Sequence, residues 1–143
     1  MKTFTGSGFG SILVISLSPG DKVLESIRQA VRDAGLRDAV VISGIATLSK
    51  VHYHRVSTLT PDPVDEFLTL KDPMEVASID GLIVDFEPHL HFTFSGLQQT
   101  IAGHLEDDST VLYLGEIVVA EVKDLNLVRY RNEHRIPQLK RRD

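Results

Sequence analysis

Residues 111–122 read VLYLGEIVVAEV and form the longest extended apolar run in the chain of 143 residues. Their β-branched and aromatic side chains favour a strand. Apolar residues follow one another almost without interruption, instead of alternating with polar ones, which predicts a strand that is covered on both faces. We expect the cover to come from a helix or from another subunit.

A helix predicted over residues 21–34 supplies such a cover. It follows the segment SPGD, in which Ser18 or Asp21 can accept hydrogen bonds from the free amides of the first turn. Gly35 provides a left-handed stop at the other end. Apolar residues recur at helical spacing and form one stripe, which predicts that one face packs on a sheet. The members of this stripe are Val23, Leu24, Ile27, Val31 and Ala34.

The remaining apolar runs are short and predict a series of strands. Ser43-Gly44 indicates a turn or bulge, and Asp80-Gly81 is a hairpin-turn signal. Strands are expected at 11–17, 38–42, 46–56, 67–70, 74–79, 89–94 and 111–122, with a short piece at 103–105. Short connections produce an antiparallel or mixed sheet with the helix on one face. The predicted fold class is therefore α+β, with a strongly curved sheet of about seven strands and one main α-helix in a single domain, 1–143.

Three histidines form the one pattern in this sequence that proposes chemistry. His89 and His91 lie two residues apart in the stretch EPHLHFTF, so a strand here places both imidazoles on one face. His104 follows His91 after a predicted turn. Three imidazole nitrogens can form a zinc site that keeps an open fourth position. We therefore predict a metal site, and the alternative is three hydrogen-bonded histidines that hold no metal.

Two further patterns bear on this prediction. His52 and His54 form a second His-x-His pair, but their polar and charged neighbours favour a solvated strand face over a pair of ligands. A cupin also carries His-x-His on a barrel strand, but it normally adds a glutamate a few residues later. Residues 92–97 contain no glutamate. The preferred ligands therefore remain the first pair and His104.

An open zinc ion can acidify its bound water or polarise a carbonyl group. Hydrolysis would also need a general base near the metal. The candidate bases, or carboxylates that orient the histidines, are Glu75, Glu87 and Glu116. A zinc-dependent hydrolase is therefore the alternative to a metal-containing binding protein.

Composition excludes several other classes of protein. The chain has no cysteine, so it has no thiolate nucleophile, no cysteine-based zinc ribbon and no disulfide. No leader-like apolar run follows Lys2, and no apolar stretch approaches the ~20 residues that span a bilayer. These features indicate a cytoplasmic protein that does not enter a membrane.

Charge is distributed unevenly along the chain. Residues 1–123 contain 9 Lys and Arg against 17 Asp and Glu, whereas residues 124–143 contain 6 against 3. Phosphate neutralisation supplies most non-specific DNA affinity, so the acidic body argues against direct duplex binding. The basic tail, about 129–143, is expected to be a solvated and partly frayed terminus. It would be the contact surface if an acidic partner or a nucleic acid were bound.

Several segments occur in an order and spacing that are typical of one family. They are LSPGD at 17–21, VISGI at 41–45, MEVASIDG at 74–81, HLH at 89–91, GHL at 103–105 and GEIVV at 115–119. This pattern resembles the plant and prokaryote conserved domain (PPC or PCC), which is often described as a DNA-binding domain with a PD1-like motif. The two histidine segments are the most specific part of the resemblance, which covers most of the chain.

The resemblance implies a compact α+β domain with a strongly curved antiparallel sheet, assembled as a homotrimer. It also implies that His89, His91 and His104 bind a metal, with zinc as the expected ion. Plant relatives grip A·T-rich DNA through an AT-hook, and this chain has no Arg-Gly-Arg-Pro-like element. We therefore expect a stand-alone, trimeric, zinc-binding regulatory module that takes a small molecule or a protein partner at the metal. Association with DNA is the family's usual description, but the missing AT-hook and the acidic body disfavour direct binding.

Overall fold

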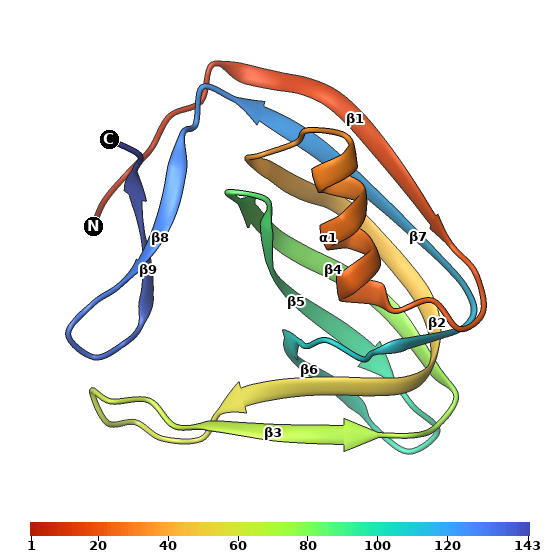
Figure 1. Ribbon diagram of the computed structural model, residues 1–143. Helices are drawn as coiled ribbons and strands as arrows, with labels where there is room; N and C mark the ends of the chain where they lie inside the picture. Colours follow the sequence, from red (N-terminus) through yellow and green to blue (C-terminus); the bar gives the residue numbers. More distant parts are fainter.

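The computed structural model describes all 143 residues and contains nine strands and one helix (Figure 1). The elements are β1 (Gly8–Leu17), α1 (Val23–Asp33), β2 (Ala39–Val56), β3 (Asp65–Leu70), β4 (Met74–Val84), β5 (Glu87–Ser95), β6 (Thr100–Leu105), β7 (Thr110–Lys123), β8 (Leu127–Arg131) and β9 (Pro137–Arg141). The helix α1 has 11 residues. No helix has the length and apolar character that crossing a bilayer requires.

Seven strands form one antiparallel sheet in the order β1-β7-β2-β4-β5-β6, with β3 paired to β2. The apolar run at 111–122 is the greater part of β7, which lies between β1 and β2. Its residues Ile117 and Val119 are fully buried. The strands curve around α1, which covers the inner side of the sheet (Figure 1). The predicted α+β fold with a curved sheet and one packed helix is confirmed.

The sheet curls until part of it closes on itself. β2 pairs with β7 and β4 through its first part and with β3 and β6 through its last part. Register shifts in the first part of β2 mark bulges, which bend a strand, and one lies beside the break predicted at 43–44. The strands β2, β4, β5 and β6 consequently form a closed ring. The closing contact places Tyr53 opposite Leu105 and His54 opposite His104.

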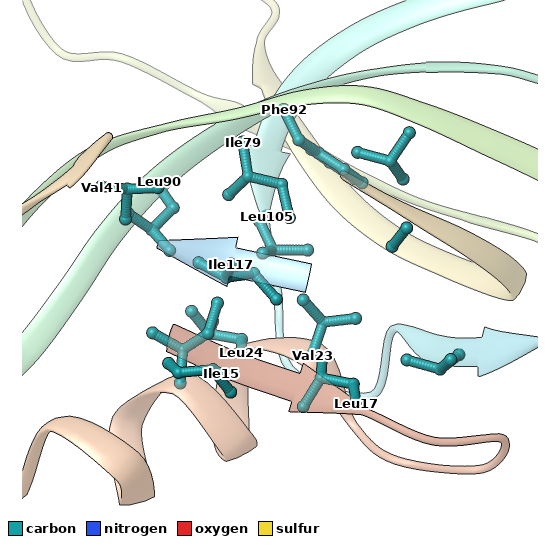
Figure 2. Close-up of a cluster of buried hydrophobic side chains, with 14 of the residues drawn as sticks. Ile15, Leu17, Val23, Leu24, Val41, Ile79, Leu90, Phe92, Leu105 and Ile117 are labelled. Atoms are coloured by element: carbon teal, nitrogen blue, oxygen red, sulfur yellow. The ribbon is translucent and has the colours of Figure 1, made fainter. Parts of the chain in front are cut away.

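The hydrophobic core lies inside the curved sheet, under the helix. Figure 2 shows Val23 and Leu24 of α1 among side chains from the strands, including Leu90, Phe92 and Leu105. These three strand residues are at most 2% exposed. Burying one such side chain contributes about 1.5–3 kcal/mol. Each of the three is next to a histidine in the sequence, so their burial turns the neighbouring histidines to the outer face of the sheet.

The ends of α1 agree only partly with the prediction. Lys22 is the N-cap residue, and no side chain caps the helix. The Asp21 carboxylate instead accepts a hydrogen bond from the Ser18 amide at 2.8 Å, which closes the preceding turn. At the other end Gly35 has a φ of 70°. The predicted side-chain cap is therefore wrong, whereas the predicted left-handed glycine is confirmed.

The predicted hairpin turn at Asp80-Gly81 is also wrong. Both residues lie inside β4, which continues to Val84. The turn into β5 is made by Asp85 and Phe86, which both have positive φ. Tight hairpins require such conformations and usually obtain them from Asn, Asp or Gly. A phenylalanine in this position is not a sequence signal for a turn.

The C-terminal segment folds as the hairpin β8–β9 instead of fraying (Figure 1). Leu127 is buried together with Val84 and Leu125 in a small second core. The Arg141 guanidinium donates to the carbonyl oxygens of Asp124 and Leu125, each at 3.1 Å. The prediction of a frayed terminus is therefore wrong.

Other basic side chains of the hairpin also bind their own chain. The Arg129 guanidinium donates to the carbonyl oxygens of Glu87 at 3.1 Å and Leu82 at 3.3 Å. Arg142 forms an ion pair with Asp85 at 2.6 Å. The guanidinium groups of Arg129 and Arg142 are therefore already bound within the chain. They are less available to neutralise the phosphates of a nucleic acid, which argues against the tail as a nucleic-acid contact surface.

Gly81 on β4 allows the backbone of β5 to approach closely beside His89. It has a φ of 144°, and a Cβ added there would lie 2.2 Å from the His89 carbonyl oxygen. We predict that Gly81→Ala lowers the free energy of unfolding by about 3 kcal/mol, because it strains the backbone and forces the strands apart. Urea unfolding followed by circular dichroism measures this loss.

Gly20→Ala is the matched control. Gly20 also has a positive φ, 92°, but open space surrounds the position of its missing Cβ. The control should lose only the cost of backbone strain, about 1 kcal/mol. Equal losses in the two variants would contradict the importance of the close approach at Gly81.

Candidate metal centre

Four histidines converge on the outer face of the closed ring of strands. His91 on β5 pairs directly with His104 on β6, and His54 on β2 pairs with His104 from the other side. His89 lies two residues before His91 on the same face of β5, as the spacing predicts. His104 therefore lies in the middle of the cluster, with an imidazole on each side.

The distances between the rings are short. The ring centroid of His104 lies 4.7 Å from that of His89, 5.2 Å from that of His91 and 4.3 Å from that of His54. The rings of His89 and His91 are 5.6 Å apart. Imidazoles bound to one tetrahedral zinc ion, with nitrogens at ~2.0–2.1 Å, have centroids about 5 Å apart. The rings of the three predicted ligands are therefore gathered at about the separation that rings around one tetrahedral ion have.

The nitrogens of His89, His91 and His104 do not all approach within 4.8 Å of one another. The set of ligand atoms that meets this distance is His54, His104 and Glu106. The rings of His89 and His91 would have to rotate to aim their nitrogens at an ion shared with His104. The assignment of these three histidines as the ligands thus stays a prediction. Their rings lie close together, but their nitrogens do not point toward one common ion position.

Glu106 is the carboxylate of the cluster, and it lies directly after β6. Its Oε1 is 2.6 Å from Nδ1 of His54 and 3.3 Å from Nδ1 of His104. The second contact is not aligned as a hydrogen bond, so Nδ1 of His104 is buried without a partner. The Glu106 amide donates to the His52 carbonyl oxygen at 3.1 Å, which holds the carboxylate beside β2.

His54 corrects one interpretation of the sequence. Its side chain is only 17% exposed, and its ring packs on those of His104 and Phe67. The His52 ring also has a partner, because its Nδ1 lies 2.9 Å from the Asp107 carbonyl oxygen. The prediction that this pair forms a solvated strand face is therefore wrong for His54.

The sequence contains a local signal for Glu106. The segment His104-Leu105-Glu106 alternates, and Leu105 is fully buried. Two residues after His104, an extended chain brings Glu106 to the same face as the histidine. No comparable local signal exists for His54, because its position depends on the closure of the sheet.

The three carboxylates predicted as a base or orienting group lie elsewhere. Glu87 begins β5, but its carboxylate pairs with Arg28 at 2.9 Å and with Arg32 at 3.5 Å on the helix. Glu75 is exposed on β4, and Glu116 is exposed on β7. No hydrogen bond or ion pair joins any of the three to a histidine. The carboxylate beside the cluster is instead the one that follows β6.

Burial favours the uncharged form of the three predicted ligands, His89, His91 and His104. Burial, together with the smaller effects of the neighbouring His104 and Arg129, lowers the pKa of His89 to about 4. Burial likewise lowers the pKa of His104 to about 4, with a smaller effect from His54. The pKa of His91 is lowered by the same two causes, burial and then His54. The three predicted ligands are thus neutral at pH 7 and have a nitrogen lone pair available, as metal binding requires.

An open hollow of about 270 Å³ adjoins the cluster and makes it accessible. It is lined by His54, Arg55, Val56, His91, Ala102, Gly103 and His104. A second hollow of about 340 Å³ is lined by residues such as Met74 and Phe94 and contains no histidine. The hollow over the histidines is therefore where a ligand of the cluster would enter.

Solved structures share this fold. A plant- and prokaryote-conserved (PPC) protein from Pyrococcus horikoshii has a TM-score of 0.82 and 22% identity, over 100% of this chain and 99% of that chain. A metal-containing protein from Archaeoglobus fulgidus has a TM-score of 0.77 and 21% identity, over 94% and 95% of the two chains. A Bacteroides thetaiotaomicron protein with a provisional DNA-binding description has a TM-score of 0.78 and 16% identity, over 97% and 98%. Identities this low establish the fold alone. Among curated proteins, none matches this sequence.

A family-level match covers most of the chain. The sequence profile of the Plants and Prokaryotes Conserved (PCC) domain matches residues 5–123. This range includes all strands of the curved sheet, the helix and the four clustered histidines, and it excludes the hairpin β8–β9. The chain therefore belongs to the Plants and Prokaryotes Conserved (PCC) domain family.

Proposed function

We propose that this protein binds a divalent metal ion, zinc by preference, through His89, His91 and His104. The metal-loaded protein would act as a homotrimeric binding module for a small molecule or a protein partner. The observation that carries the proposal is the convergence of uncharged imidazoles from β5 and β6 beside an open hollow. Neutral imidazole nitrogen is among the preferred ligands of zinc.

The energetics of the cluster support a bound cation. Burying a polar atom without a hydrogen-bond partner costs free energy. The cluster contains such an atom, Nδ1 of His104, and it holds three more imidazoles close to that ring. Coordination would offset this cost by giving the nitrogens a positively charged partner. The metal-containing description of the Archaeoglobus protein of the same fold agrees with this proposal.

The surrounding chain would determine what binds. Zinc held by three imidazoles keeps an open position that binds or polarises an oxygen or nitrogen atom of a ligand. The pairing of β5 with β6 fixes the backbone of His91 and His104, and the pairing of β5 with β4 places His89 opposite Leu82. The hollow beside His91 and His104 leaves room for a small ligand, with Arg55 among its lining residues.

Elemental analysis tests the ligand assignment. After loading with zinc and dialysis, the wild-type protein should retain at least about one zinc ion per chain. A variant with His89→Ala, His91→Ala and His104→Ala should retain less than roughly a tenth of that amount, because all three nitrogen ligands are lost. His134→Ala is the control, because its ring pairs with Asp62 outside the cluster. Equal zinc in the triple variant and the wild type would contradict the proposal.

The outer face of the sheet supports assembly into a trimer. The strands β1, β7 and β2 are adjacent and leave a group of large apolar side chains exposed. This group comprises Ile12, Val14, Ile42, Ile45, Tyr113 and Leu114. Monomeric proteins rarely expose large contiguous apolar surfaces. A second and a third copy of the chain would cover the face of β7 that the helix does not cover.

Light scattering after size-exclusion chromatography tests the assembly. The wild type should have about three times the chain mass of 15.9 kDa. Val14→Asp should reduce the mass to that of one chain, because it introduces a charge into the apolar interface. Val64→Asp is the control, because Val64 is similarly exposed, at 56%, but lies in the loop before β3. A monomeric wild type, or a trimeric Val14→Asp variant, would contradict the trimer.

A further inference from the structure

Two members of the histidine cluster are not used by the proposed three-histidine site. His54 is held on β2, and Glu106 follows β6, yet their side chains meet beside His104. Their ligand atoms and one nitrogen of His104 lie within 4.8 Å of one another. We infer that His54, His104 and Glu106 form a cation-binding position of their own, which takes a divalent transition-metal ion.

The chemistry of this set suits such an ion. Two imidazole nitrogens and a carboxylate oxygen are common ligands of zinc and of other divalent transition metals. The separations of 2.6 Å and 3.3 Å from Glu106 Oε1 to the two Nδ1 atoms bracket the ~3.0 Å between neighbouring ligands around a six-coordinate ion. The ion would take the place of the proton in the hydrogen bond between His54 and Glu106.

The buried nitrogen of His104 points to a missing partner independently of these distances. Its Nδ1 is shielded from solvent and makes no hydrogen bond, although Glu106 is 3.3 Å away. Buried polar atoms are nearly always satisfied. If Glu106 served only to hold the ring of His54 in place, and the ion of the three-histidine site were bound by Nε2 of His104, this Nδ1 would remain without a partner. A cation between the three side chains satisfies it.

Two of the three ligands border an open hollow, and the carboxylate has few competing contacts. His54 and His104 both line the hollow of about 270 Å³. The nearest other carboxylate to His54 is that of Asp65, 3.9 Å from Nε2. No lysine or arginine pairs with Glu106, so its carboxylate is available to an ion. This inference rests on the proposed function only in that His104 belongs to both sets.

The test removes the proposed site and asks whether binding remains. Titration with Co²⁺ alone, followed by its visible absorption and by calorimetry, is carried out on the His89→Ala/His91→Ala variant. This variant should still bind one Co²⁺ per chain. Adding Glu106→Gln or His54→Asn to it should weaken Co²⁺ binding at least about tenfold, because each replaces a carboxylate or imidazole ligand by a weakly binding neutral amide.

The controls are two changes that leave the ligand atoms of the position intact. His52→Asn alters the histidine two residues before His54, and Glu75→Gln alters an exposed carboxylate on β4. Neither should change Co²⁺ binding in the same background. Should the double variant fail to fold, His54→Asn and His52→Asn are compared in the wild type, where only the first should weaken binding.

The outcomes separate this inference from the proposed function. If the His89→Ala/His91→Ala variant binds no Co²⁺, or if Glu106→Gln leaves its binding unchanged, the inference is overturned while the three-histidine site stands. If the loss of His89 and His91 leaves the wild-type affinity unchanged and Glu106→Gln removes it, the inference stands and the proposed ligand set fails.

Discussion

The pairing of β2 with β6 is the contact on which the rest of the site depends. It joins the last part of one long strand to a short strand that forms some fifty residues later, and it closes the ring of four strands. Tyr53 and Leu105 lie opposite each other on the inner side and are buried, whereas His54 and His104 lie opposite each other on the outer side. The close approach requires Gly103, because a Cβ there would lie 2.6 Å from a ring carbon of Tyr53. The same pairing thus packs the core and gathers the imidazoles.

Burying several imidazoles close together is unfavourable in free energy, and the burial of apolar core residues offsets this cost. Four rings share a small part of the surface, and burial lowers the pKa of His89 and of His104 to about 4. Leu90, Phe92 and Leu105 alternate with the histidines, so the free energy gained by burying them holds the strands in this register. A bound cation would convert the costly arrangement into a favourable one. Loading with metal is therefore expected to couple to the stability of the fold.

Features set by local periodicity could be predicted from the sequence, and features set by closure could not. The apolar stripe of α1 and the placement of His89 and His91 on one face follow from the periods of helix and strand. The role of His54 depends on a partner strand far away in the sequence, so its polar neighbours suggested a solvated face. Glu106 does have a local signal, because it lies two residues after His104, but its contact with His54 again depends on the closure of the sheet. The basic residues of the C-terminal segment predict a frayed terminus. The hairpin forms because a few apolar residues, such as Leu127, pack in a small second core.

Anomalous diffraction from crystals of the zinc-loaded protein, recorded on both sides of the zinc absorption edge, tests the central claim most directly. That claim is that the outer-face histidines of β5 and β6 form a metal site. We expect an anomalous peak ~2.0–2.1 Å from one nitrogen each of His89, His91 and His104. A map of fully loaded crystals with no peak at these three rings would contradict it.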